Sequence, residues 1–458
     1  MDIIIVGAGE VGSALAGKLS REGHDVTVVE SGREKLELLQ ERFDVQGVLG
    51  SGTEPEILLA AGIARVDACV AVTDSDSTNI VVCMMAKAYG KPEIRKMARL
   101  RSDTLLSELD ITLKTHLPVD WVVHPEVLAV RRIVDKVRYP QLDEIIRFVS
   151  GKVAVAGLTL KKGHPVVGKT IEELRKARQL PFLIGLVIRK GEISIPRGTM
   201  LLAEGDLIYI IAPVQKLGQI LKAFTAEGST YRQVMIAGGT VLAEKIGQKL
   251  AREGIRVKML VSGKKAALAL AERNESILVI DSEPTDLATL TEEAGESLDL
   301  FVAATGQDEV NVVASMLAQQ AGVPHTVTVV RKRKLAQRLA GLPLGMIVSP
   351  RSVAVEHILH MLRENSRFEL DSFSPLEGTK VREFTIQETS PMVNRLVREL
   401  SFPVQTLVGA LVRGNRVVIP DGDTKLQVGD RALCFALSSS LEPLEGFWEQ
   451  SGDKVIRR

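Results

Sequence analysis

Three glycines near the start of the chain have the spacing of a phosphate-binding turn. Gly7, Gly9 and Gly12 follow an apolar, β-branched run at residues 3–6, which predicts a buried parallel strand. In such a turn the first glycine permits a tight bend, the second lets backbone N–H groups approach a pyrophosphate, and the third lets the next helix pack closely. The helix expected over residues 13–21 directs the positive end of its dipole at the phosphates. The pattern therefore predicts a dinucleotide site.

An acidic residue completes this pattern. Glu30 ends a second predicted strand at residues 25–29, about 20 residues beyond the glycines, where a carboxylate can accept hydrogen bonds from a ribose 2′-OH. The same charge would repel a 2′-phosphate. We therefore expect NAD(H), or an adenine nucleotide with a free 2′-OH, rather than NADP(H).

Strand-like and helical segments alternate from residue 1 to about residue 123, which predicts a doubly wound parallel sheet. In the strand order 3-2-1-4-5-6 the ligand lies outside the carboxyl ends of strands 1 and 4. This order places Thr73 and Asp74 beside the glycine turn, with Ser51 and Gly52 at the adenosine side. The further strands are expected at residues 45–49, 68–72, 93–99 and 120–123, and helices at 54–61 and 77–89.

Two arginines alternate along the fifth predicted strand. Arg99 and Arg101 are two residues apart, so their side chains point to the same side of the sheet. They are either surface cations or contacts to nucleotide phosphates, including those of a nucleotide held by a neighbouring subunit.

The chain is a tandem duplication. A helix expected at residues 125–138 leads into a small α+β module with strand-like runs at 153–160, 182–188 and 207–211 and one helix at 171–178. The motif K-L-S-R-E-G, ending at Gly23, then returns as K-L-A-R-E-G, ending at Gly254. We predict two doubly wound parallel-sheet (Rossmann-like) domains, each followed by a small α+β domain, at residues 1–124, 140–224, 231–349 and 366–450. Further residues recur in pairs: Thr73 and Thr305, Asp76 and Asp308, Asn79 and Asn311, Pro125 and Pro350.

The second sheet domain lacks the features that would bind a dinucleotide. Thr240 stands opposite Gly9, which restricts the approach of the backbone to a pyrophosphate. Ala243 stands opposite Gly12, and Val261 removes the ribose acceptor supplied by Glu30. We predict that this domain has kept its fold and has lost or altered its ligand.

Composition excludes several other classes of function. Lys and Arg total 58 against 57 Asp and Glu, and aromatic residues make up 4%, so no basic or stacking surface selects nucleic acid. The three cysteines lie in apolar runs and are expected to be buried thiols. No apolar run approaches the length of a membrane span, and a strand begins at once, so a soluble cytoplasmic protein is expected. No catalytic or metal-binding constellation is evident.

One further segment matches a phosphate-binding pattern only by its letters. Residues 163–170 read G-H-P-V-V-G-K-T, which fits the P-loop consensus. Pro165 removes an N–H donor that the loop needs, and Val166 and Val167 resist its positive-φ turns. We therefore expect that Lys169 is not a phosphate ligand.

The chain resembles a known family through G-A-G-E-V-G, V-T-V-V-E, T-D-S-D-S-T-N, A-R-L-R at residues 98–101 and a duplicated P-x-G-x-x-L-x-x-G-D module. This is the family of Trk potassium-uptake regulatory proteins, whose units are called RCK or KTN domains, and the resemblance covers essentially the whole chain. It implies a subunit on the inner face of the cell membrane that binds NAD(H) or ATP/ADP and controls a Trk-type potassium transporter. By position, the resemblance assigns ligand contacts to Gly7, Ala8, Gly9, Glu10, Val11, Gly12, Glu30, Thr73, Asp74 and Arg99.

An NAD-dependent oxidoreductase is the alternative function. Such an enzyme needs an acid–base residue facing the nicotinamide, usually from a substantial second domain. The domains that follow the sheets here are small, and His164 is the only histidine in the first of them. A non-catalytic regulator is therefore favoured. Because transporter gating usually requires a symmetric assembly, we expect a homo-oligomer.

Overall fold

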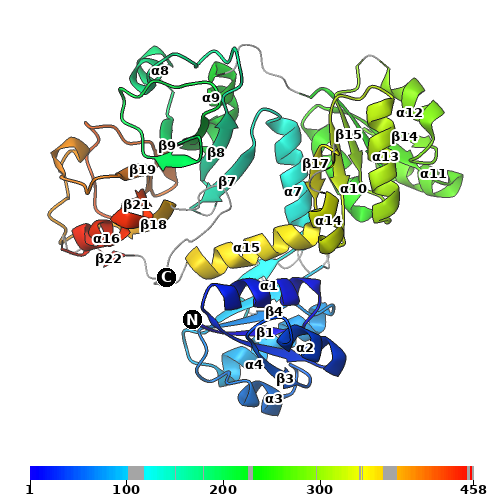
Figure 1. Ribbon diagram of the computed structural model, residues 1–458, viewed down its shortest axis with the longest axis horizontal. Helices are drawn as coiled ribbons and strands as arrows, with labels where there is room; N and C mark the ends of the chain where they lie inside the picture. The colour runs from blue at the N-terminus through cyan, green and yellow to red at the C-terminus, as the bar shows by residue number, and fades with distance from the viewer. Residues whose placement is uncertain are drawn as a thin grey trace. The chain divides into compact units, whose positions relative to one another are not determined.

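The computed structural model describes residues 1–101, 118–149, 151–178, 180–224, 231–295, 297–339, 342, 344–364, 379–450, 454 and 455. The chain divides into two compact units, Met1–Val137 with Tyr231–Leu362, and Arg138–Thr230 with Arg363–Arg458. The first unit holds two parallel sheets and the second holds two antiparallel sheets (Figure 1). This confirms the predicted fold class. The four domain boundaries stay predictions, and residues 102–117 and 366–378 of those domains lie outside the described residues.

The first parallel sheet has the predicted strand order, β3-β2-β1-β4-β5-β6. Its strands are short and almost fully apolar where they are covered on both faces, as β1 and β4 are. Helices α1 and α2 contribute to the core on one face, and α3 and α4 to the core on the other. The elements are β1 (Asp2–Val6), α1 (Glu10–Arg21), β2 (Asp25–Glu30), α2 (Arg33–Gln40), β3 (Gln46–Leu49), α3 (Pro55–Ala60), β4 (Ala68–Ala71), α4 (Asp76–Tyr89), β5 (Arg95–Arg99) and β6 (Trp121–Val123).

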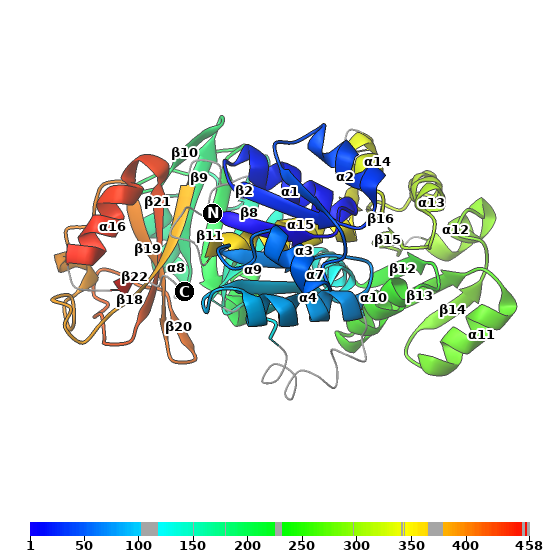
Figure 2. The same ribbon diagram turned by 90° about the horizontal axis from the view of Figure 1, so that it is seen from below.

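The second parallel sheet repeats this arrangement in the order β14-β13-β12-β15-β16-β17. Figure 2 shows α11 lying beside β13 and β14. The elements are β12 (Gln233–Ala237), α10 (Val241–Arg252), β13 (Arg256–Val261), α11 (Lys264–Arg273), β14 (Leu278–Asp281), α12 (Leu287–Ala294), β15 (Leu300–Ala303), α13 (Asp308–Gln320), β16 (Thr326–Val329), α14 (Arg333–Leu339) and β17 (Met346–Val348).

The two sheets exchange the helices that follow them. Helix α7 (Pro125–Arg138) follows the first sheet in sequence but buries Ala129, Val130, Ile133, Val134 and Val137 in the core of the second sheet. Helix α15 (Pro350–Glu364) follows the second sheet but buries its apolar residues on the first (Figure 1). Each large buried side chain contributes about 1.5–3 kcal/mol, so the exchange holds the two halves together strongly. The residues that α15 buries are Ala354, Val355, Ile358, Leu359 and Leu362.

Polar contacts support the exchange. The Arg132 Nη1 of α7 lies 2.7 Å from the Glu356 Oε2 of α15. Near the C-terminus of α15, the Arg95 Nη1 donates to the carbonyl oxygen of Leu362 at 2.8 Å. An arginine at a helix C-terminus satisfies a carbonyl that has no partner within the helix. The end of α15 is therefore fixed to β5 of the first sheet, directly before the chain enters the second unit.

The second unit consists of two related antiparallel sheets, ordered β10-β9-β11-β8-β7 and β20-β19-β21-β18-β22. Strands β11 and β21 are each followed by a helical segment. The expectation of one helix in the first small domain was therefore wrong, because α9 is a second helix in that domain. The first domain contains β7 (Glu144–Phe148), β8 (Val153–Thr159), α8 (Ile171–Arg178), β9 (Leu183–Arg189), β10 (Glu192–Ser194), β11 (Leu207–Pro213), η1 (Val214–Lys216) and α9 (Leu217–Phe224). The second contains β18 (Thr379–Thr385), η2 (Val397–Glu399), β19 (Thr406–Arg413), β20 (Arg416–Val418), β21 (Arg431–Leu437), η3 (Ser438–Ser440), α16 (Leu441–Gln450) and β22 (Lys454–Val455).

The repeated glycine–aspartate motif of the small domains has a structural role. Asp206 and Asp430 are fully buried, and each carboxylate accepts two hydrogen bonds from one arginine at 2.7–2.8 Å. These donors are Arg189 and Arg413. The hydrogen bonds from Arg189 hold the pKa of Asp206 below its ordinary value. The two sheets also share one apolar core, in which the Phe148 and Phe435 rings meet edge to face at 6.3 Å.

The remaining expectations concern the cysteines and membrane-spanning segments. Cys69, Cys83 and Cys434 are buried free thiols, as predicted. Among the described helices, none combines the length and apolarity that crossing a bilayer requires.

Candidate nucleotide-binding site

The three glycines of the first turn meet three different steric demands. Gly7 has φ +105°, and a Cβ there would lie 3.1 Å from the Thr73 backbone nitrogen. A Cβ at Gly12 would lie 1.8 Å from the carbonyl oxygen of Gly7, so α1 could not pack as it does. At Gly9, apart from its chain neighbours, no described atom lies within 4 Å of a Cβ position. The open side of the turn is therefore at Gly9, where a pyrophosphate is expected.

The N-terminus of α1 is arranged to receive an anion. Gly9 occupies the N-cap position, and no side chain of the described residues caps the helix there. The turn is fixed from behind by the Ser13 Oγ, which donates to the carbonyl oxygen of Ala8 at 2.7 Å, while Val11 is buried in the core. A helix end without a side-chain cap presents backbone N–H groups and the positive end of the helix dipole. These features fit a phosphate group.

Glu30 lies at the edge of the same turn. Its Oε2 accepts from the Ala8 N–H at 2.6 Å and its Oε1 from the Gly32 N–H at 2.9 Å. Partial burial pushes the pKa of Glu30 upward, but these hydrogen bonds and the charge of Lys35 outweigh it, and the pKa lies below its ordinary value. A charged carboxylate is thus held next to the glycine turn, which fits the predicted role as a ribose acceptor.

A buried asparagine joins the ends of β4 and β5. The Asn79 Oδ1 accepts from the Thr73 backbone nitrogen at 2.9 Å and from its hydroxyl at 2.7 Å. The Asn79 Nδ2 donates to the carbonyl oxygen of Arg99 at 2.7 Å. Because Thr73 also abuts Gly7, this side chain sets the position of the residues facing the turn. Asn311 makes the same contacts in the second sheet, with Thr305 and with the carbonyl oxygen of Val329.

Arg99 and Arg101 converge on Asp74, but β5 ends at Arg99, so Arg101 lies beyond the strand on which it was expected. The Arg99 Nη1 donates to the Asp74 Oδ1 at 3.3 Å, and the Arg101 Nη2 donates to the same oxygen. The side chain of Arg99 is only 8% exposed whereas that of Asp74 is 82% exposed. Burial lowers the pKa of Arg99, and the charge of Arg101 adds to this effect. Arg99 is thus a buried cation at the end of β5 and not a surface charge.

Sequence reasoning missed one residue at this site. The Arg351 Nη1, from the first turn of α15, lies 2.7 Å from the Glu10 Oε2 in the glycine turn. The only sequence signal is a change of charge after the repeated proline, since Glu126 follows Pro125 and Arg351 follows Pro350. The contact itself depends on the exchange of α7 and α15, which no local pattern indicates.

The equivalent turn of the second sheet is closed by its own side chain. The Thr240 Oγ1 accepts from the Ala243 N–H at 3.2 Å and donates to the carbonyl oxygen of Ala304 at 2.8 Å. Thr240 therefore caps α10 at the place where Gly9 leaves α1 without a side-chain cap. Val261 packs 3.1 Å from a Cβ position on Gly239. This geometry agrees with the predicted loss or alteration of the ligand.

Residues 163–170 do not form a phosphate loop. The N–H groups of Val167, Gly168 and Lys169 donate to the carbonyl oxygens of His164, Leu202 and Val166. The Thr170 N–H donates to the Glu173 Oε2 at 2.7 Å and so belongs to the start of α8. Because these backbone donors have protein partners, they do not form a cradle for an anion.

A duplicated parallel sheet with a glycine turn at its first helix, each copy followed by a small antiparallel domain, defines a tandem protein of the Rossmann-like nucleotide-binding class. The family model described as the TrkA-N domain matches residues 3–125 and 234–350, and the model described as the TrkA-C domain matches 155–225 and 381–444. The chain belongs to this family of TrkA-N and TrkA-C domain proteins, and the resemblance drawn from the sequence is confirmed.

Relatives match the chain over almost its whole length. The Trk system potassium uptake protein TrkA of Azorhizobium caulinodans is 28% identical, with 98% of this chain and 99% of that protein covered. A TrkA homolog of Archaeoglobus fulgidus is 29% identical, with 97% and 99% covered. Among solved structures, the GsuK RCK domain is 17% identical with a TM-score of 0.60 over 98% of this chain and 95% of that chain. The structure of the GsuK channel bound to NAD has a TM-score of 0.61 at 17% identity, over 98% of this chain and 79% of that chain.

Proposed function

We propose that this protein is a regulatory subunit that binds a nucleotide in its first sheet domain and thereby controls a Trk-type membrane potassium transporter. The observation that carries the proposal is the match of both halves to proteins named Trk system potassium uptake protein TrkA, over 98% of this chain. The protein works as a binding module and not as an enzyme.

The proposed ligand is NAD(H), with ATP or ADP as the other adenine nucleotides that the same residues could hold. The turn from Gly7 to Gly12 would hold the pyrophosphate, and Glu30 would hold the ribose. The part of the nucleotide that lies towards β4 and β5 would contact Thr73, Asp74 and Arg99. Support comes from the open face at Gly9 and from the carboxylate held beside it. The GsuK channel, which shares the fold, has been solved bound to NAD.

Helix α15 is the element that would carry the response. It begins beside the glycine turn, where Arg351 contacts Glu10, and it ends where Arg95 holds the carbonyl oxygen of Leu362. After Leu362 the chain enters the second unit. A nucleotide that binds more tightly when α15 is in one position would therefore favour that position. The point at which the chain enters the second unit would shift with the helix. Moving a gate from mostly closed to mostly open needs a preference of about 5.5 kcal/mol, which several sites in an oligomer could supply together.

The proposed place of action is the cytoplasmic face of the membrane, as a homo-oligomer attached to the transporter. A symmetric ring of subunits would add together the binding preferences of its separate sites. A single site in one chain could not supply the whole preference alone.

Potassium flux through the reconstituted transporter tests this proposal. Flux should change when the protein is added and should change again on adding NAD, NADH, ATP or ADP. A complex that forms but responds to none of these nucleotides would contradict gating. The same nucleotides are tested for turnover by following NADH oxidation against a panel of carbonyl compounds, because turnover would favour the oxidoreductase alternative.

A further inference from the structure

The ion pair between Glu10 and Arg351 joins the two halves of the chain at the ligand site. Glu10 is the first residue of α1 and lies inside the glycine motif, whereas Arg351 is the second residue of α15. Their charged atoms are 2.7 Å apart, and both side chains are partly exposed. The Glu10 Oε2 also lies 3.4 Å from the backbone nitrogen of Arg333, from the start of α14. The second half of the chain therefore places positive groups against the first turn.

Glu10 puts a negative charge where the ligand would bring its own. A carboxylate at the first turn of a helix interacts favourably with the helix dipole, which is also the interaction expected of a bound phosphate. A diphosphate at this helix end would lie beside the Glu10 carboxylate and compete with it for the same cation. Glu10 therefore acts as a substitute for the phosphate towards Arg351.

Arg351 is not the only guanidinium group in this part of the chain. The Arg99 Nε is buried and has no hydrogen-bond partner among the described residues. Burial lowers the pKa of Arg99 most, with further contributions from the positive charges of Arg101 and Arg351. Arg351 is thus close enough to Arg99 for the two charges to interact. Asp74 already pairs with Arg99 and Arg101, and a further anion between this group and Arg351 would stabilise the remaining positive charge.

We infer that Arg351, supplied by the second half of the chain, contacts a phosphate of the nucleotide bound by the first glycine turn, and that Glu10 holds it until the nucleotide binds. This inference rests on the proposed nucleotide site. It gives the second half a role at that site although its own turn is closed by Thr240. Arg351 is a specificity-determining residue that favours adenine nucleotides with a diphosphate over the nucleoside.

The test compares three variants by calorimetric titration with NADH, ADP and adenosine. Arg351→Gln should weaken NADH and ADP binding about tenfold, because a charge-assisted hydrogen bond is lost. Glu10→Gln should tighten their binding about two- to fivefold, because it removes the competing charge. Arg132→Gln is the matched control. Arg132, on α7, likewise makes a 2.7 Å ion pair with α15, but its partner is Glu356. This control should leave all affinities within twofold. The affinity for adenosine, which has no phosphate, should be unchanged in all three variants.

The direction of the two effects separates this inference from a merely structural role. If the ion pair only held the halves together, Glu10→Gln and Arg351→Gln would shift affinity in the same direction, and that result would overturn the inference. An unchanged affinity in Arg351→Gln would also overturn it. Nucleotide binding by the unaltered protein tests the proposed function separately. If the proposed function is wrong, the unaltered protein binds neither NADH nor ADP.

Discussion

The Gly12 and Gly7 backbones approach each other so closely that a Cβ on Gly12 would lie 1.8 Å from the Gly7 carbonyl oxygen. Helix α1 can pack against the end of β1 only because residue 12 has no side chain. The contact places the open N-terminus of α1 next to Gly9, and the geometry of the whole site depends on it.

Gly12→Ala is expected to damage the fold and the site together. The added methyl group forces α1 away from Gly7, and overpacking of this kind costs about 1–3 kcal/mol. We expect a lower urea midpoint, followed by tryptophan fluorescence or circular dichroism, and weaker NADH binding. Ala243→Gly, at the matching place in α10, is the control and should leave NADH affinity unchanged. A Gly12→Ala protein with unaltered stability and affinity would refute the packing argument.

Gly9→Val is expected to remove binding while sparing the fold. Gly9 has φ −66° and ψ −174°, a conformation open to any residue, and no described atom beyond its chain neighbours lies within 4 Å of a Cβ there. The valine would instead occupy the space of the pyrophosphate. Titration with NADH should give no measurable binding, at an unchanged urea midpoint. Gly306→Val, at an equally open glycine after β15, is the control and should bind normally. Full stoichiometry in Gly9→Val would show that the ligand lies elsewhere.

Asn79 and Asn311 offer a matched pair for separating stability from binding. Both amides are fully buried and bridge the ends of neighbouring strands. Replacing either by alanine leaves backbone groups without a partner, at a cost of about 2–3 kcal/mol. Both variants should therefore have lower urea midpoints. NADH affinity, measured at a temperature where each is folded, should fall for Asn79→Ala alone. Equal loss of affinity in both would contradict a single site in the first half.

The strand order and the glycine turn could be predicted because their signals are local. Apolar runs, glycine spacing and the acid at Glu30 each lie within one strand–helix–strand unit, and the repeat supplied a second instance of the same pattern. Helix α9 could also have been found, since Leu217, Ile220, Leu221 and Phe224 follow helical spacing and are all buried.

The exchange of α7 and α15 could not be predicted. Their amphipathic patterns show that each helix has an apolar face, but not which of two similar sheets covers it. The contact between Glu10 and Arg351 depends on that exchange and was missed with it. The loss or alteration of the ligand in the second sheet was predicted in part from Thr240. That Thr240 caps α10 became evident only from its contacts with Ala243 and Ala304.

Lys169→Ala is expected to leave nucleotide binding unchanged. The backbone N–H groups around Lys169 donate to carbonyl and carboxylate oxygens of the protein, and the Lys169 side chain is exposed. A phosphate-binding lysine would lose several kcal/mol of charge-assisted interaction on substitution. Titration with ATP and ADP should instead give affinities within twofold of the unaltered protein. A loss of a hundredfold or more would restore residues 163–170 as a phosphate loop.

Glu30→Gln is expected to change stability in a pH-dependent way. The pKa of Glu30 in the folded protein lies below its ordinary value of 4.5. Its charged form is therefore favoured by folding, and this contribution is present above pH 4.5 and is lost as the pH falls through the lowered pKa. At pH 7 the variant should be less stable by about 1 kcal/mol, a modest figure because the side chain is half-exposed. The gap between the urea midpoints should close as the pH falls through the lowered pKa of Glu30. A gap that stays constant with pH would contradict a role for the charge.

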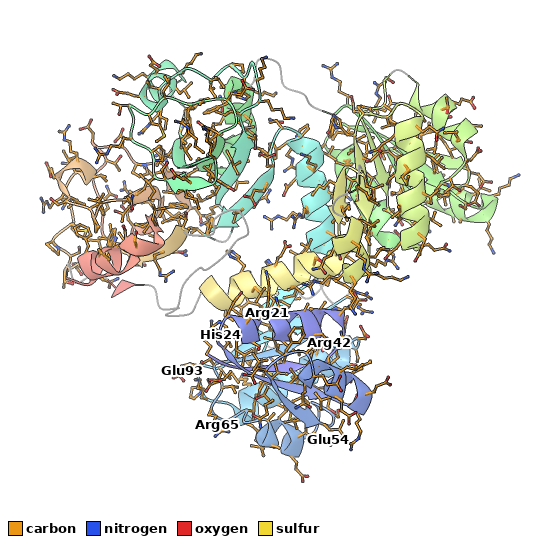
Figure 3. All side chains as sticks on the ribbon, in the orientation of Figure 1. Arg21, His24, Arg42, Glu54, Arg65 and Glu93 are labelled. Carbon is orange, nitrogen blue, oxygen red and sulfur yellow. The ribbon has the colours of Figure 1, made fainter. Side chains whose placement is uncertain are left out.

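The same substitution tests the choice of nucleotide. A charged carboxylate beside the ribose repels a 2′-phosphate, so the unaltered protein should bind NADH far better than NADPH. In Glu30→Gln the repulsion is removed together with a strong acceptor for the 2′-OH, so NADH affinity falls and NADPH affinity rises. Glu93→Gln is the control. Glu93 is an exposed carboxylate just before β5, so it lies at the end of the parallel strands opposite to Glu30 (Figure 3). This control should keep the preference of the unaltered protein. If Glu30→Gln also keeps that preference, Glu30 does not face the ribose, and the turn binds its nucleotide in another orientation.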